Sequence, residues 1–155
     1  SVATNEKLPP DVYAQLAPLL ITVDDWVTRS NMASNPATPI DILEQLSTDS
    51  QGDVLIGLAR NPSVPAEMLV RLANAADPRT RRVAALNTAT PRDVLDSLAR
   101  DSDADVRCSV AGNPKTPIEL LRSLAADSKG EVRWAVAQNP STPTAVLEAM
   151  ANGRL

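Results

Sequence analysis

Apolar and polar positions recur along the chain at a fixed step of 26 residues. Each copy has an asparagine, a proline four residues later, and leucines eight and eleven residues later, the last replaced once by methionine. These columns are Asn35, Asn61, Asn87, Asn113 and Asn139; Pro39, Pro65, Pro91, Pro117 and Pro143; Leu43, Leu69, Leu95, Leu121 and Leu147; and Leu46, Leu72, Leu98, Leu124 and Met150. Five copies in one register indicate an array of repeated structural units.

The hydrophobic spacing after each Asn-Pro-type turn predicts a first helix. In one copy the apolar residues are Leu120, Leu121, Leu124 and Ala125, which share one face of a helix with 3.6 residues per turn. Thr116 suits the N-cap, Pro117 the first helical position, and Glu119 the third position of a capping box. We therefore expect a helix of about ten residues, ending near 125–127.

A second, shorter helix is predicted after an acidic loop at residues 101–105. Val106, Val110 and Ala111 are again spaced for one helical face. The segment has about six to eight residues before Asn113-Pro114, and a proline disfavours helix at the residue before it. A short α-helix or a 3₁₀-helix is expected. Strand-type alternation is absent, so the class is all-α.

The repeats define the expected organisation as one repeat domain over residues 1–155. Full repeats span 35–60, 61–86, 87–112 and 113–138, and a truncated repeat spans 139–155. Residues 1–34 form a divergent N-terminal capping repeat, aligned through Pro9, with four extra residues within 18–23. The incomplete last repeat suggests a piece of a longer array. No unit can bury its apolar face alone, so the units stack into an α-solenoid.

The string Asn113-Pro114-Lys115-Thr116-Pro117, with the leucines and the Val-Arg segment that follow it, resembles the leucine-rich repeat variant family. The resemblance covers residues 35–150, and more weakly the first copy. It implies a right-handed superhelix of alternating α- and 3₁₀-helices. The founding type of that family carries a Cys-rich iron–sulfur segment that this sequence does not match, so no such cofactor is expected. The alternative fold is a HEAT-like α–α superhelix, although HEAT repeats have about 40 residues or more.

Composition narrows the possible chemistry. The chain has no His and one Cys, which excludes His-dependent catalytic pairs, internal disulfides and four-thiolate metal sites. The absence of a disulfide fits a cytoplasmic setting, and no apolar run is long enough to span a bilayer. Residues 1–7 contain no apolar targeting segment. We expect no metal, no cofactor and no enzymatic activity.

Two polar columns invite both a structural and a functional interpretation. The Asn column either holds the turns and the backbone of a neighbouring repeat or presents stacked amides to a ligand; turn chemistry is favoured. The Arg column comprises Arg29, Arg81, Arg107 and Arg133, with Leu55 as the exception. It either forms ion pairs with Asp49, Asp101 and Asp127 or binds anions; the ion pairs are favoured.

Positions that vary between repeats are free to serve a partner. The position after the Arg column reads Ser30, Ile56, Arg82, Cys108 and Trp134, and residues three before and four after share its helical face. The candidate partner-binding residues are Ile56, Arg60, Arg79, Arg82, Leu86, Cys108, Trp134 and Gln138. Trp134 is either a binding anchor or a cover for the open C-terminal end.

The sequence therefore predicts a non-enzymatic interaction scaffold that binds a protein or peptide through the solenoid surface. The alternative is a nucleic-acid or anion binder that uses the Arg column. A net charge of −4 disfavours nucleic acid. The lone thiol of Cys108, beside Arg107, is either a reactive group with a lowered pKa or, as we favour, an ordinary packed residue.

Overall fold

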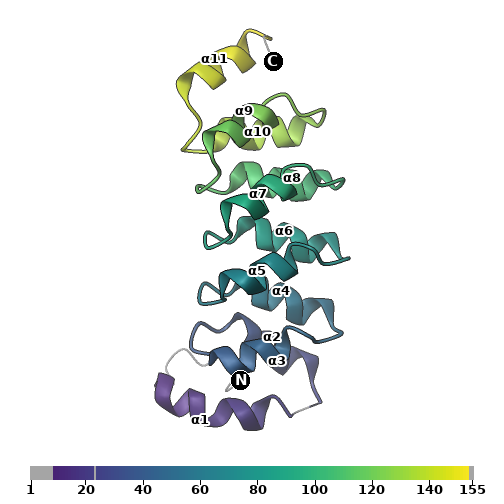
Figure 1. Ribbon diagram of the computed structural model, residues 1–155, viewed down its shortest axis with the longest axis vertical. Helices are drawn as coiled ribbons and strands as arrows, with labels where there is room; N and C mark the ends of the chain where they lie inside the picture. The colour runs from purple at the N-terminus through teal and green to yellow at the C-terminus, as the bar shows by residue number, and fades with distance from the viewer. Residues whose placement is uncertain (1–8, 23, 154–155) are drawn as a thin grey trace.

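The computed structural model describes residues 9–22 and 24–153, which form eleven α-helices and no strand. The helices are stacked along one axis from the N-terminal to the C-terminal end (Figure 1). Their bounds are α1 Pro10–Leu20, α2 Trp26–Ser34, α3 Ile40–Leu46, α4 Gly52–Arg60, α5 Ala66–Leu72, α6 Pro78–Leu86, α7 Arg92–Leu98, α8 Ala104–Gly112, α9 Ile118–Leu124, α10 Gly130–Gln138 and α11 Thr144–Ala151. The predicted all-helical solenoid is confirmed.

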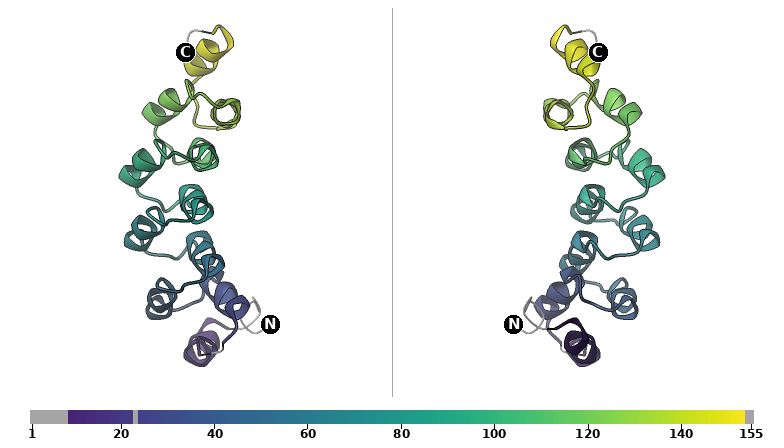
Figure 2. Two further views of the ribbon diagram at one scale, coloured as in Figure 1. Left: turned by 90° about the vertical axis from the view of Figure 1, so that its right-hand side faces the viewer. Right: turned by 90° about the vertical axis from the view of Figure 1, so that its left-hand side faces the viewer.

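The helices form two columns, which curve together (Figure 2). We call α2, α4, α6, α8 and α10 the inner helices, because they line the hollow side of the curve. We call α3, α5, α7, α9 and α11 the outer helices; they follow the bulging side. The inner helices pack most extensively on one another, from repeat to repeat. Tight packing on one side and wider spacing on the other produce the curvature.

The expected helix lengths are reversed. The outer helix α9 has seven residues rather than about ten, and the inner helix α8 has nine rather than six to eight. Both are α-helices, so of the two alternatives for the second helix the α-helix is confirmed, and the 3₁₀-helix implied by the family resemblance is not found among the described helices. Inner helices start every 26 residues, at Gly52, Pro78, Ala104 and Gly130, a step well short of the HEAT period.

Threonine has a different role from the predicted one. Thr116 is not the N-cap of α9: that position is Pro117, which has no side-chain cap. The buried hydroxyl of Thr116 donates instead to the carbonyl of Val110 in the preceding inner helix. The same bond recurs from Thr90 to Ala84 at 2.6 Å. The threonine therefore ties the turn to the end of the inner helix, and the outer helix begins only after the proline.

The fixed apolar columns form one continuous core. Leu43, Leu69, Leu95 and Leu121 are all buried, whereas Leu147 in the last copy is partly exposed. At the other end, α1 has 11 residues where α3 has seven, so the extra residues lengthen the first helix. The predictions for residues 1–7, Val23 and Leu155 lie outside the described residues.

Candidate protein-binding groove

The Asn column is a ladder that joins successive repeats. The Nδ2 atom of Asn113 donates to the carbonyls of Ala85 and Asn87, at 2.7 and 3.1 Å, and its Oδ1 accepts from the backbone N–H of Lys115 at 2.9 Å. Asn61, Asn87 and Asn139 repeat all three bonds. The structural interpretation of the column is confirmed: each side chain holds its own turn and the backbone of the preceding repeat.

The Arg column is a second ladder. The guanidinium groups of Arg81 and Arg107 make paired hydrogen bonds to Asp101 and Asp127, twenty residues on, at 2.7–3.1 Å. Arg29 contacts Asp49 at 2.6 Å. Arg81 and Arg107 also donate to loop carbonyls of their own repeats. The ion-pair interpretation is confirmed for these three arginines.

Arg133 differs from the other members of the column. It is exposed and donates to the Asp127 carbonyl at 2.7 Å, and twenty residues on the chain has Gly153 in place of an aspartate. The anion-binding role of Arg29, Arg81, Arg107 and Arg133 stays a prediction. The structure gives it little support, because three of the four groups already hold carboxylates.

These ion pairs shift the titration of the aspartates. Hydrogen bonding to Arg81 lowers the pKa of Asp101, and hydrogen bonding to Arg107 lowers the pKa of Asp127, against the opposing effect of burial. Each Oδ1 also accepts a backbone N–H two residues on, from Asp103 and Lys129. The aspartates therefore remain charged at the junctions between repeats.

In one repeat, apolar residues replace both the arginine and the aspartate of this ladder. Where the Arg column has Leu55, the position twenty residues on has Ala75 instead of aspartate. Leu55 packs against the hydrophobic core. Both members of the ion pair are thus replaced together at this step, which avoids an unpaired charge at a partly buried site.

The predicted partner-binding residues lie together on the inner helices. Three pockets follow one another along these helices. The first includes Ile56, Arg60, Arg79 and Arg82; the second includes Arg60, Arg82 and Leu86; the third includes Leu86, Cys108, Trp134 and Gln138. Because neighbouring pockets share lining residues, we treat them as one feature, the inner groove. It runs along the inner helices, the column that lines the hollow side of the curve (Figure 2). Whether a partner binds there stays a prediction.

Trp134 and Ile56 differ in exposure, although they occupy one column. Trp134 is 67% exposed, so it does not serve as a buried cover for the C-terminal end. Ile56 is only 9% exposed, so its side chain belongs to the core as well as to the wall of the first pocket. Its neighbour Gly57 lets α2 and α4 approach closely: a Cβ there would lie 2.7 Å from the Ser30 carbonyl oxygen.

The groove also contains a residue that the sequence analysis missed. Trp26, at the start of α2, is 46% exposed and lines the first pocket with Ser30. It lies four residues before Ser30, and residues at that spacing share a helical face. Trp26 is not among the candidates because they lie three residues before and four residues after the varying position, whereas Trp26 lies four residues before Ser30.

Cys108 is not set up as a reactive thiolate. Burial raises its pKa, and the nearby carboxylates of Asp105 and Glu131 raise it further. Arg107 points to Asp127 instead of the sulfur. The thiol contacts the Glu131 carbonyl at 3.7 Å. It is an ordinary wall residue of the groove, as favoured from the sequence.

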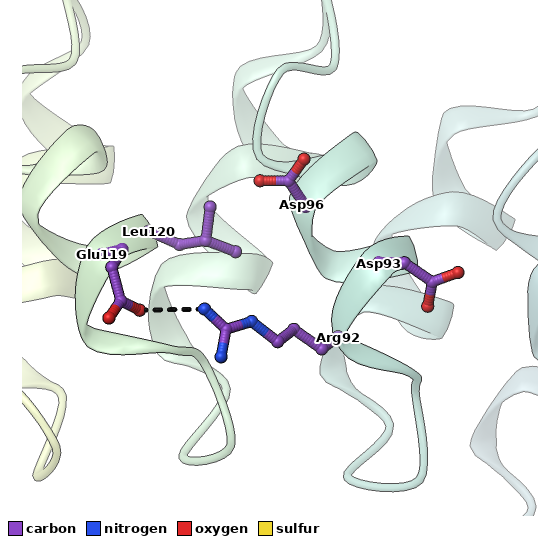
Figure 3. Close-up of a pocket in the computed structure, with 5 residues that line it drawn as sticks. All are labelled: Arg92, Asp93, Asp96, Glu119 and Leu120. Atoms are coloured by element: carbon purple, nitrogen blue, oxygen red, sulfur yellow. Dashed lines mark hydrogen bonds and ion pairs between the residues drawn. The ribbon is translucent and has the colours of Figure 1, made fainter.

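A further pocket lies between the outer helices α7 and α9. It is lined by Arg92, Asp93, Asp96, Glu119 and Leu120, and an exposed ion pair from Arg92 to Glu119 crosses it at 3.1 Å (Figure 3). Asp96 is additionally paired with Arg100 one turn on. The charges in this pocket largely satisfy one another, so it offers less to a partner than the inner groove.

The comparison with known families agrees with this architecture. The model of the leucine rich repeat variant family matches residues 104–128. This segment runs from the start of α8 through α9 to the loop beyond it. The resemblance inferred from the repeat pattern is thereby confirmed. No curated protein matches the chain.

Across residues 9–22 and 24–153, no helix combines the length and apolarity that crossing a bilayer requires. In the same part of the chain, no cluster of three or more His, Cys, Asp or Glu side chains is arranged to hold a metal ion.

Proposed function

We propose that this protein is a non-enzymatic scaffold that binds a protein or peptide segment in the inner groove. The observation that carries the proposal is that fixed and varying positions of the repeat have different locations in the structure. The fixed Asn and Leu positions are largely buried and hold the stack together, whereas the varying positions of the inner helices line a continuous row of pockets.

Trp134 supports this proposal. A tryptophan that is 67% exposed on a hollow surface contributes little to the stability of the free protein. Tryptophan and arginine are the side chains most enriched among residues that dominate interface energies. Both kinds occur along the inner groove, together with the half-exposed Leu86. The groove thus has the composition of an interface centre.

The test compares variants on the two sides of the solenoid. Wild-type protein, Trp134→Ala and the outer-helix control Ile118→Ala are immobilised and exposed to nuclease-treated extract of the native cells. The bound proteins are identified by mass spectrometry. We expect a partner that wild type and Ile118→Ala retain and Trp134→Ala loses. A partner retained equally by all three forms would contradict binding in the groove.

The alternative function is nucleic-acid or anion binding through the Arg column. Phosphate contacts release counterions, so binding of this kind weakens steeply as salt rises. A salt series with a labelled oligonucleotide separates the two functions. The Arg–Asp pairs at three steps of the ladder support the protein-binding function instead. The cytoplasmic setting, predicted from the cysteine content, remains a proposal.

A further inference from the structure

We infer that the inner groove takes an extended peptide segment with an acidic residue at one end and a large apolar residue about five or six positions away. This inference rests on the proposed function and names the chemistry of the partner. It follows from an uneven distribution of charge and apolar surface along the groove. One part presents unpaired arginines, and the other presents exposed apolar side chains.

The basic part lies between α4 and α6. Arg60 and Arg82 are exposed and line two of the three pockets. Among the described residues neither makes an ion pair or a side-chain hydrogen bond, in contrast to the arginines of the ladder. Arg79 lies in the same pocket but already contacts Asp77 at 3.1 Å. Two free guanidinium groups therefore face the groove, and their planar donors suit a carboxylate.

The negative groups nearby do not cancel this charge. Asp53 lines the same pocket and Asp77 already pairs with Arg79, so three arginines stand against two carboxylates and one positive charge remains. Asp105 and Glu131 belong to the next inner helices, at their first turns. A positive patch on a chain of net charge −4 is a local feature that attracts an acidic partner and repels a basic one.

The apolar part lies on α8 and α10 and reaches the end of α6. Trp134 of α10 and Leu86 of α6 expose their side chains on its walls, and Cys108 of α8 contributes its partly buried sulfur. Gly112 adds open space, because a Cβ placed there would meet nothing within 4 Å. The pocket is lined mainly by apolar atoms and contains no charged side chain. It fits a leucine, isoleucine or aromatic side chain.

The separation of the two parts sets the spacing in the peptide. Arg82 of the basic part lies on α6 and Trp134 of the apolar part lies on α10, two helix-to-helix steps apart (Figure 1). Packed helices lie about 8–10 Å apart, so two steps measure about 16–20 Å. An extended chain advances about 3.3 Å per residue, so this distance corresponds to about five or six residues.

The experiment is a selection from a displayed library of random twelve-residue peptides on the full chain. Peptides that also bind Arg60→Glu/Arg82→Glu are removed by counter-selection in a parallel arm. We expect enrichment of peptides that combine Asp or Glu with a large apolar residue five or six positions away. A fluorescein-labelled synthetic representative should lose at least tenfold in affinity on Arg60→Glu/Arg82→Glu, on Trp134→Ala, and on Asp→Asn in the peptide.

Arg122→Glu on α9 is the matched control, since it reverses an exposed charge on the outer side. It should leave peptide affinity within twofold, and thermal melts should show every variant folded. Groove-dependent peptides without any acidic preference would overturn this inference and leave the proposed function standing. An absence of peptides that depend on Trp134 would overturn both. A labelled single-stranded oligonucleotide that binds more tightly than any selected peptide, and depends on Arg60 and Arg82, would show a nucleic-acid groove instead.

Discussion

Replacing Asn113 with alanine removes a side chain that is 1% exposed and makes three hydrogen bonds to backbone. The change removes the partner of the Ala85 carbonyl and of the Lys115 N–H, whereas the Asn87 carbonyl keeps its bond from the Thr90 N–H. A buried polar group left unpaired costs about 1–3 kcal/mol, and the Lys115 group can turn to water more easily than the Ala85 carbonyl. We therefore expect a loss of about 1–3 kcal/mol, mainly from the Ala85 carbonyl.

Urea unfolding followed by circular dichroism measures this loss. With a slope of about 2 kcal/mol per molar urea, the midpoint should fall by about 0.5–1.5 M. Asn74→Ala is the matched control, because Asn74 is exposed and its amide makes one bond, to Val70 within the same repeat. Its cost should be about 0.5 kcal/mol or less.

Asn113→Asp sharpens the argument. The aspartate keeps an acceptor for the Lys115 N–H but places a negative oxygen opposite two carbonyl oxygens. It should destabilise the protein more than alanine does, since the second oxygen of a buried carboxylate would lack a donor and face two carbonyl oxygens. Equal midpoints for Asn113→Ala and Asn74→Ala would refute the role of the ladder in holding the stack.

Three further predictions follow from exposure, charge and the apolar step of the ladder. Trp134→Ala should change stability by about 0.5 kcal/mol or less, and Ile56→Ala should cost about 2–4 kcal/mol; urea midpoints check both. Asp101→Asn should remove part of the stability that wild type has at neutral pH. Because folding lowers the pKa of Asp101, this stability is present above the ordinary pKa of Asp and is lost as pH falls through the folded pKa. A pH series of melts should therefore show wild type and variant converging in acid. Leu55→Arg and Ala75→Asp should each destabilise, while the double variant should recover about 1–2 kcal/mol relative to their sum, measured in a double-mutant cycle; strict additivity would contradict pairing at this step.

The sequence predicted the architecture because the repeat supplies its own alignment. Columns with one residue type, such as the Asn and Leu columns, had to serve a contact that recurs in every unit. The Arg–Asp pairs could be proposed because both columns share the period. The pairing of Leu55 with Ala75 was equally visible, as a joint departure twenty residues apart.

Helix boundaries were less predictable, because local signals compete. Thr116 followed by proline has the sequence pattern of an N-cap. Its hydroxyl instead donates to the carbonyl of Val110 in the preceding helix. The true cap signal belonged to the inner helices: the Asp103 side chain accepts from the backbone N–H groups of Asp105 and Val106. Residues assigned to an acidic loop therefore start a helix, which lengthens the inner element.

The burial of individual groove residues needed tertiary information. A varying column indicates a surface, but the depth of each position depends on how closely its two helices approach. The absence of a side chain at Gly57 lets α2 meet α4 closely, and Ile56 beside it is buried. The repeat period alone does not distinguish the buried position of Ile56 from the position of Trp134, where the indole is exposed.

The registers of the two ladders have a consequence for the length of the molecule. If residues 87–112 were deleted as a block, Asn113 would inherit the place of Asn87 and face the carbonyls of Ala59 and Asn61. Arg81 would likewise meet Asp127 in the place of Asp101. Every interlocking bond would be restored without a new side chain. A gene encoding such a chain can gain or lose whole units by unequal recombination, and each event lengthens or shortens the hollow surface while the joints between units stay the same.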